Sequence, residues 1–217
     1  MTDTLVARFA ETAARAGDRI ALVHGAERVS FAALEARSAA FAARLRQRGI
    51  GPGDRVLVAM GVCPDLFAVL AALWRCGAAA VFPEPALGLS GLRHAARTTR
   101  PRALVATGWY RLLGLLPELW GVPTLVPAFD GTEALAPEPL SPEAPALISF
   151  TSGSTGRPKA IVRSHAFLLA QHAAVAPILA GEAEEVDFVG FPVFALVNLA
   201  EGRTSVLPPW RMRSQHR

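Results

Sequence analysis

Short apolar runs alternate along the chain with longer segments in which apolar residues recur every three or four positions. The short runs predict strands at 20–24, 27–30, 55–60, 79–82, 103–106, 146–150, 160–163 and 186–190. The periodic segments predict helices at 4–16, 31–48, 64–75, 90–99 and 165–176. This alternation of strands and helices is typical of an α/β protein.

Capping and turn residues divide these segments. Gly17 and Gly49 end the first two helices, while Ser30 and Ser164 are placed to cap the amino termini of the helices that follow them. The sequence also predicts a hairpin turn between the strands at 20–24 and 27–30, and a further turn at 51–54.

The middle of the chain is less regular. Prolines are frequent over 117–145, and 136–145 is predicted to be an exposed connector. Residues 1–210 are interpreted as one partial domain. Residues 211–217 form an irregular basic tail, for which we expect truncation or a frameshift as the cause.

Composition excludes several classes of protein. The 217 residues are 52% hydrophobic, enough for one sizeable domain or a large part of a bigger one. The apolar runs at 66–74 and 188–200 are too short to span a membrane. The first ten residues contain Asp3 and Arg8 and lack the apolar core of a signal peptide. We therefore predict a cytoplasmic protein without a transmembrane segment.

The charge balance and the cysteines change this interpretation little. The net charge is +4 and the isoelectric point about 10.0, but the arginines are scattered and no aromatic residues interleave with a basic cluster, so nucleic acid is not expected as a partner.

Cys63 and Cys76 are expected to be two buried thiols, although a disulfide between them is the alternative.

A segment rich in glycine and hydroxyl side chains follows the strand at 146–150 and ends in the only lysine among 22 basic residues. Glycine lets backbone N–H groups approach an anion closely, hydroxyl groups donate to phosphate oxygens, and lysine adds a compact charge. The predicted phosphate-binding residues are Thr151, Ser152, Gly153, Ser154, Thr155, Gly156 and Lys159.

This loop differs from the Walker phosphate loop. The Walker pattern places lysine directly after its second glycine and continues into a helix. Here arginine and proline separate Gly156 from Lys159, and a strand follows. The alternative is a surface hairpin of small polar residues. The flanking strands and the single lysine favour phosphate binding.

Residues 151–159 resemble the signature loop of the AMP-binding, adenylate-forming superfamily, which includes acyl-CoA synthetases, luciferases and the adenylation domains of peptide synthetases. Residues 29–34 with 45–56 and residues 73–81 resemble two further blocks of this superfamily, and His165 matches the histidine that usually follows the loop. The resemblance runs from about residue 5 to residue 208.

The resemblance implies the adenylate-forming fold, with a mixed sheet flanked by helices. It also implies an ATP-dependent reaction in which a carboxylic acid becomes an acyl-adenylate with release of pyrophosphate. Coenzyme A or another nucleophile then displaces AMP. ATP, Mg²⁺ and the acid are thus the expected ligands, CoA is a possible co-substrate, and the loop would hold the β- and γ-phosphates.

Three residues are candidates for the nucleotide or substrate pocket. His165 has two readings, a direct functional role or packing at a helix start against the sheet. Phe191 and Phe194 fall in a segment, 191–198, that lines the acyl pocket in the family. Ala195 stands where many members have histidine, which is similar to ligases of long-chain fatty acids, including the β-lactone synthetases of olefin pathways; Phe194 could equally be a core aromatic.

Family members are much longer, so we expect this chain to be an incomplete amino-terminal domain. By resemblance, the groups for adenine, ribose and the metal ion, and the lid with its catalytic lysine, lie beyond residue 217. No metal ligand is therefore identified in the chain. Two functional readings remain: the amino-terminal part of an acid ligase, or a non-catalytic fragment that retains only the phosphate loop. By resemblance the expected substrate class is a fatty or β-hydroxy fatty acid; the individual acid, the acceptor and the oligomeric state are not predicted.

Overall fold

A computed structural model of the chain describes residues 3–83, 88–131, 133–151, 158–179, 181 and 186–208. Its helices are α1 (Leu5–Ala16), α2 (Phe31–Gln47), α3 (Pro64–Arg75), α4 (Gly88–Thr99), η2 (Gly108–Leu115), η3 (Pro117–Leu119), α5 (His165–Val175) and α6 (Pro192–Glu201). Its strands are β1 (Ile20–His24), β2 (Glu27–Ser30), β3 (Arg55–Ala59), β4 (Ala79–Phe82), β5 (Ala103–Ala106), β6 (Thr124–Leu125), β7 (Pro145–Thr151), β8 (Lys159–Ser164), β9 (Val186–Phe188) and β10 (Thr204–Leu207).

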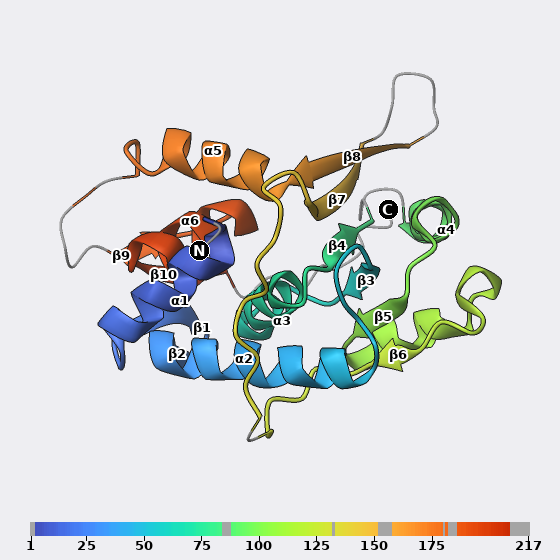
Figure 1. Cartoon of the computed structure of the whole chain (residues 1–217), viewed down its shortest axis with the longest axis horizontal. Coiled ribbons are helices and arrows are strands. Elements are labelled where there is room, and N and C mark those ends of the chain that lie inside the picture. Colours follow the sequence, from blue (N-terminus) through green and yellow to red (C-terminus); the bar gives the residue numbers. More distant parts are fainter. Residues whose placement is uncertain are drawn as a thin grey trace.

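The strands form two mixed sheets (Figure 1). The larger sheet has the order β6-β5-β3-β4-β7-β8, in which only the β7–β8 pair is antiparallel. The smaller has the order β2-β1-β10-β9, with β1–β2 antiparallel. The expected mixed α/β fold is confirmed. The sequence did not predict α6, β6, β10 or the 3-10 helices η2 and η3, and β9 ends two residues before the predicted strand does.

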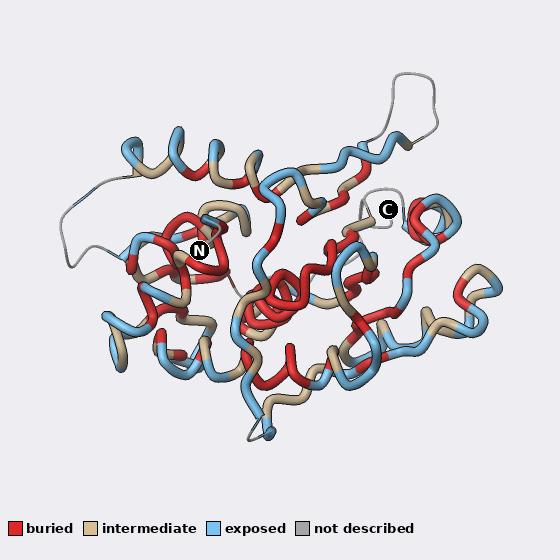
Figure 2. The backbone as a smooth tube through the Cα atoms, viewed as in Figure 1, coloured by how far each residue is buried: buried red, intermediate tan, exposed pale blue. Residues whose placement is uncertain are grey.

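Helix α3 lies at the centre of the fold, against α2 and strands of both sheets. Every residue of α3 except Asp65 is buried, and most of the helix is red in Figure 2. A helix that is apolar on all sides must be covered on all sides, so the sheets and α2 enclose it. Within the described residues, no helix has the length and apolar character needed to cross a membrane.

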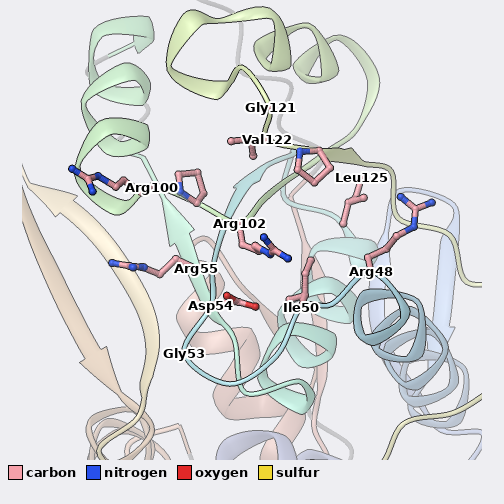
Figure 3. Close-up of a pocket in the computed structure, with 12 residues that line it drawn as sticks. Arg48, Ile50, Gly53, Asp54, Arg55, Arg100, Arg102, Gly121, Val122 and Leu125 are labelled. Carbon is pink, nitrogen blue, oxygen red and sulfur yellow. The ribbon is translucent and has the colours of Figure 1, made fainter.

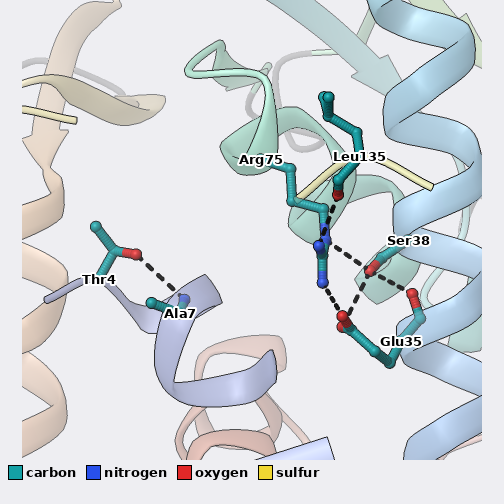
Figure 4. Close-up of polar contacts among 6 residues, drawn as sticks. All are labelled: Thr4, Ala7, Glu35, Ser38, Arg75 and Leu135. Carbon is teal, nitrogen blue, oxygen red and sulfur yellow. Dashed lines mark hydrogen bonds and ion pairs between the residues drawn. The ribbon is translucent and has the colours of Figure 1, made fainter. Parts of the chain in front are cut away.

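Three helices begin with a side-chain cap. The hydroxyl oxygen of Thr4 accepts a hydrogen bond from the backbone N–H of Ala7 at 3.2 Å, which makes Thr4 the cap of α1 rather than its first residue (Figure 4). Ser30 and Ser164 accept in the same way at the start of α2 and α5, so both predicted caps are confirmed.

The predicted exposed connector is in part packed against the helices, and that prediction was therefore partly wrong. The backbone N–H of Glu138 donates to the carbonyl oxygen of Arg75 at 3.0 Å, and the Arg46 guanidinium pairs with the Glu138 carboxylate at 2.5 Å. Leu140 is buried. These contacts fix where the chain enters β7 because they lie directly before that strand.

A close approach at Gly77 packs the turn after α3 against this connector. Gly77 has a φ of 74°, and a Cβ there would lie 2.8 Å from a methyl carbon of Leu140 and 3.1 Å from the Cα of Pro52. We expect Gly77→Ala to lower the free energy of unfolding by about 2 kcal/mol, through left-handed backbone strain and overpacking. Urea unfolding measures this change. Gly61→Ala, which meets no atom within 4 Å, is the matched control, and an equal loss in both variants would contradict the prediction.

The two cysteines are free, so the disulfide alternative is excluded. Cys76 is buried, and burial raises the pKa of its thiol to about 11. Cys63 is only half-buried, which differs from the expectation for that residue. The predicted tail at 211–217 lies outside the described residues.

Candidate functional site

Strands β7 and β8 bring the two ends of the predicted phosphate loop together. Thr151, the last residue of β7, is directly opposite Lys159, the first residue of β8. Side chains directly opposite in an antiparallel pair lie on one face, with Cβ atoms about 5 Å apart. The side chains of Thr151 and Lys159 therefore start from neighbouring positions on one face, and both residues are exposed. The predicted residues Ser152, Gly153, Ser154, Thr155 and Gly156 lie outside the described residues.

The alternation of side chains along β7 explains this placement. Ala146, Ile148 and Phe150 point into the core, so the residues between them, with Thr151, point the other way. On this second face the Arg163 guanidinium donates to the Ser149 hydroxyl at 2.6 Å. Two cationic side chains and two hydroxyl side chains thus share one face of the hairpin.

A histidine of α4 holds the described end of the loop. The Nε2 atom of His94 lies 2.9 Å from the carbonyl oxygen of Pro158, so this nitrogen carries the proton and donates to the carbonyl. The His94 ring also packs edge-on against Phe150, with ring centroids 5.8 Å apart. One side chain therefore contacts Phe150, directly before the loop, and Pro158, near its end. Sequence reasoning missed His94 because its helix carries no motif.

His165 lies in the core at the start of α5. Its side chain is 1% exposed, and its ring packs edge-on against Trp74 at 6.2 Å between centroids. Within the described part of the chain neither ring nitrogen has a hydrogen-bond partner, and burial lowers the pKa of the imidazole to about 4. The ring is therefore neutral near pH 7. A direct contact with nucleotide stays a prediction.

Trp74 links α3 to the strand that leads to the loop. Its indole Nε1–H donates to the carbonyl oxygen of Ala146 at 2.8 Å, and the side chain is buried. This bond fixes the first part of β7 over α3. The sequence offered no signal for it because the two residues are far apart in the chain.

Phe191 and Phe194 lie together at the start of α6. Their rings make an edge-on contact with centroids 6.4 Å apart, and Phe191 is 70% exposed. Phe194 packs partly against the core. They border the smaller sheet, whereas the loop belongs to the larger sheet. Their role in an acyl pocket stays a prediction.

The described residues contain no cluster of metal-ligating side chains. Mg²⁺ prefers carboxylate oxygens together with phosphates of the bound substrate. Among the residues with assigned positions, no group of three or more histidine, cysteine, aspartate or glutamate side chains is placed to hold a metal ion. The hairpin face instead offers hydroxyl groups and cations, which are the groups that bind phosphate oxygens directly.

Comparison with known proteins gives related ligases and synthetases. The chain is 34% identical over 198 residues to the olefin β-lactone synthetase of Xanthomonas campestris pv. campestris, a match that covers 83% of this chain and 35% of that protein. It is 31% identical over 168 residues to the 3-hydroxybenzoate–CoA ligase of Aromatoleum sp., covering 70% of this chain and 32% of that ligase. The chain therefore spans about a third of the length of these curated relatives.

Solved structures share the fold. The structure of VinN in complex with 3-methylaspartate superposes with a TM-score of 0.82 at 22% identity, over 95% of this chain and 62% of that one. The profile of the family described as AMP-binding enzyme matches residues 9–199, which is most of the chain. This chain is therefore a member of the AMP-binding enzyme family and corresponds to the amino-terminal part of its relatives.

Proposed function

We propose that this chain supplies the ATP phosphate-binding part of a ligase that activates a carboxylic acid as an acyl-adenylate. The observation that carries the proposal is the pairing of Thr151 with Lys159 across the β7–β8 hairpin, in a chain of the AMP-binding family. This pairing puts a residue with a hydroxyl and a residue with an ammonium opposite each other at the two ends of the glycine-rich segment.

The proposed reaction needs stabilisation of negative charge on the departing phosphates. A carboxylate oxygen bonds to the α-phosphorus of ATP, the bond from that phosphorus to the bridging oxygen breaks, and pyrophosphate leaves with the electron pair. Lys159 and the loop donors would bind the β- and γ-phosphates as this charge develops. ATP would enter as its Mg²⁺ complex, with the metal ion held on the phosphates of the substrate.

For the acid we propose a fatty or β-hydroxy fatty acid, with CoA or another nucleophile as the acceptor in a second step. The support is the 34% identity to an olefin β-lactone synthetase and the aromatic pair of exposed Phe191 and partly buried Phe194. The aryl class is the competing substrate, since a relative named as a 3-hydroxybenzoate–CoA ligase is nearly as similar. A cytoplasmic location is part of the same proposal.

The second candidate function is phosphate binding without catalysis. The observation that favours it is coverage, because the chain spans 35% of the olefin β-lactone synthetase. The two candidates make the same prediction for phosphate binding and opposite predictions for turnover.

We expect Lys159→Ala to weaken ATP binding to this chain by about tenfold to a hundredfold, because a charge-assisted hydrogen bond contributes about 1.5–3 kcal/mol. Isothermal titration with Mg²⁺ and ATP measures the effect. Lys159→Arg should restore only part of the affinity, since its planar fork does not reproduce a compact ammonium. Arg28→Ala, at an exposed position of β2, is the matched control for loss of one positive charge.

Carboxylate-dependent exchange between ATP and pyrophosphate separates the two candidates. We expect no exchange from the 217-residue chain alone, and exchange from a protein that joins residues 9–199 to the remaining part of the Xanthomonas synthetase. Fatty, β-hydroxy and aryl acids are compared in the same assay. An inactive but folded fusion would support phosphate binding without catalysis, and exchange by the chain alone would show that these residues suffice.

A further inference from the structure

A cavity of about 470 Å³ lies at the amino-terminal edge of the larger sheet (Figure 3). It is lined by Arg48, Ile50, Gly53, Asp54, Arg55, Arg100, Pro101, Arg102, Gly121, Val122, Pro123 and Leu125. Strands β3, β4, β5 and β7 run in the same direction, so the first residues of β3 and β5 share one edge of the sheet. Thr151, the last residue of β7, lies at the other edge. This cavity is therefore separate from the phosphate loop.

Four arginines and one aspartate are the charged residues of the cavity. Arg48 caps the end of α2, Arg55 begins β3, and Arg100 and Arg102 flank Pro101 in the connection between α4 and β5. In Figure 3, Arg102 and Asp54 lie in the middle of the view, while Arg55 and Arg100 extend toward the same side.

The one carboxylate does not neutralise these arginines. An oxygen of Asp54 accepts a hydrogen bond from the backbone N–H of Gly51 at 2.9 Å. Within the part of the chain that the structure describes, none of these four guanidinium groups forms an ion pair or a side-chain hydrogen bond. By contrast, Arg44 and Arg46, on the same helix as Arg48, each pair with a carboxylate.

Four unpaired positive charges around one cavity raise the local potential and repel one another. An anion bound among them would offset that repulsion and satisfy the free N–H donors. Guanidinium groups present two parallel donors that match the oxygens of phosphate. A ligand that carries several negative charges would be favoured over one with a single charge.

The walls of the cavity are rigid. Pro101 and Pro123 restrict the backbone on one side, and buried Ile50 and Leu125 give an apolar floor. Arg100 has a φ of 45°, and within the described segments it is the one residue other than glycine in the left-handed region. Glycine is the usual residue at the left-handed position directly after a helix. The backbone of Arg100 is therefore strained. Such a fixed frame lowers the entropy lost when a ligand binds.

We propose that this cavity is a second binding site, for a small anion that carries two or more phosphate groups. Its volume is in the range of small-molecule sites, and its charged rim over an apolar floor suits a phosphorylated organic molecule. The site does not depend on the phosphate loop, because it lies at the opposite edge of the sheet.

The test uses sodium tripolyphosphate as the probe, titrated into the full 217-residue chain at fixed ionic strength. Lys159→Ala is the parent protein throughout, so that binding by the loop lysine does not contribute. We expect Arg55→Gln with Arg102→Gln to raise the dissociation constant at least about tenfold, since two charge-assisted contacts are lost. The matched control is Arg28→Gln with Arg111→Gln, two exposed arginines outside the cavity, for which we expect a change below about twofold.

Citrate is titrated in parallel as a carboxylate probe of similar charge. Near-ultraviolet circular dichroism checks that each variant is folded, and Arg48→Gln alone provides a second, milder variant of the same cavity. Equal weakening by both double variants would mean general charge attraction and would overturn the proposal. Tighter binding of citrate than of tripolyphosphate, or no binding of tripolyphosphate by the parent protein, would overturn it as well.

Discussion

Replacing Glu35 with alanine is expected to lower the free energy of unfolding by about 3 kcal/mol, because the buried guanidinium of Arg75 would lose its counter-charge. Arg75 is 2% exposed, and its ion pair with Glu35, which is 26% exposed, is one of three side-chain contacts (Figure 4). Its Nε–H donates to the Ser38 hydroxyl at 3.1 Å and its Nη1 to the carbonyl oxygen of Leu135 at 2.8 Å.

The expected loss is larger than for a surface ion pair because of where these groups lie. Arg75 ends α3, Glu35 and Ser38 lie on α2, and Leu135 lies in the segment between β6 and β7. One guanidinium thus joins two helices and this segment. Without the carboxylate, the charge remains buried and its desolvation is not offset.

Urea unfolding of the single and double variants tests this prediction. Glu35→Ala with Arg75→Met should be more stable than Glu35→Ala alone, since the uncompensated charge is removed and an apolar side chain of similar length fills its place. Glu27→Ala removes the exposed partner of Arg37 and should cost less than about 1 kcal/mol. A loss at Glu35 no larger than that of this control would show that the Arg75 charge is solvated.

Local signals in the sequence predicted much of the fold. The cap at Ser30 and the glycine after α2 located that helix to within one residue. The apolar run at 146–150 located β7, and the glycine-rich segment with the single lysine located the loop between β7 and β8. Such signals depend on residues a few positions apart, which is why a single sequence suffices for them.

Long-range contacts account for most of what was missed. Strand β10 pairs in parallel with β1, which lies about 180 residues earlier in the chain, and this pairing creates the second sheet. Only four residues long, β10 has no pattern that identifies its partner. Helix α6 is different, because Pro192 at its start and Gly202 at its end were available as helix signals. The interpretation of 191–198 as a pocket segment obscured them.

In the candidate site, too, local signals were predictable from the sequence and long-range contacts were not. Residue types and spacing made Lys159 a candidate, but His94 was not predictable because its contact joins a helix to Pro158, 64 residues away and just before β8. The arginine cavity was also missed. Its four arginines are separated along the sequence and come together only because parallel strands begin at a common edge.

Acidification should destabilise this protein through His165 by up to about 3 kcal/mol between pH 6.5 and pH 4. Burial, with no charged partner, lowers the pKa of this imidazole to about 4 in the folded chain, whereas an unfolded histidine has a pKa of about 6.5. Between these values the unfolded chain binds more protons, so stability falls as the pH falls. The full contribution is present above about pH 6.5 and is lost below about pH 4.

His165→Phe keeps an aromatic ring against Trp74 and removes the titration, so urea unfolding at several pH values isolates the effect. We expect this variant to be at least as stable as the parent at pH 7, because neither ring nitrogen of His165 has a partner to lose among the described residues. It should also lose about 3 kcal/mol less between pH 7 and pH 4. His24→Gln, at the half-buried end of β1, is the control for the loss of a histidine side chain. An unchanged profile for His165→Phe would mean that the imidazole reaches solvent, as a residue that contacts the nucleotide must. The pH profile therefore decides between the two roles that the sequence allowed for His165.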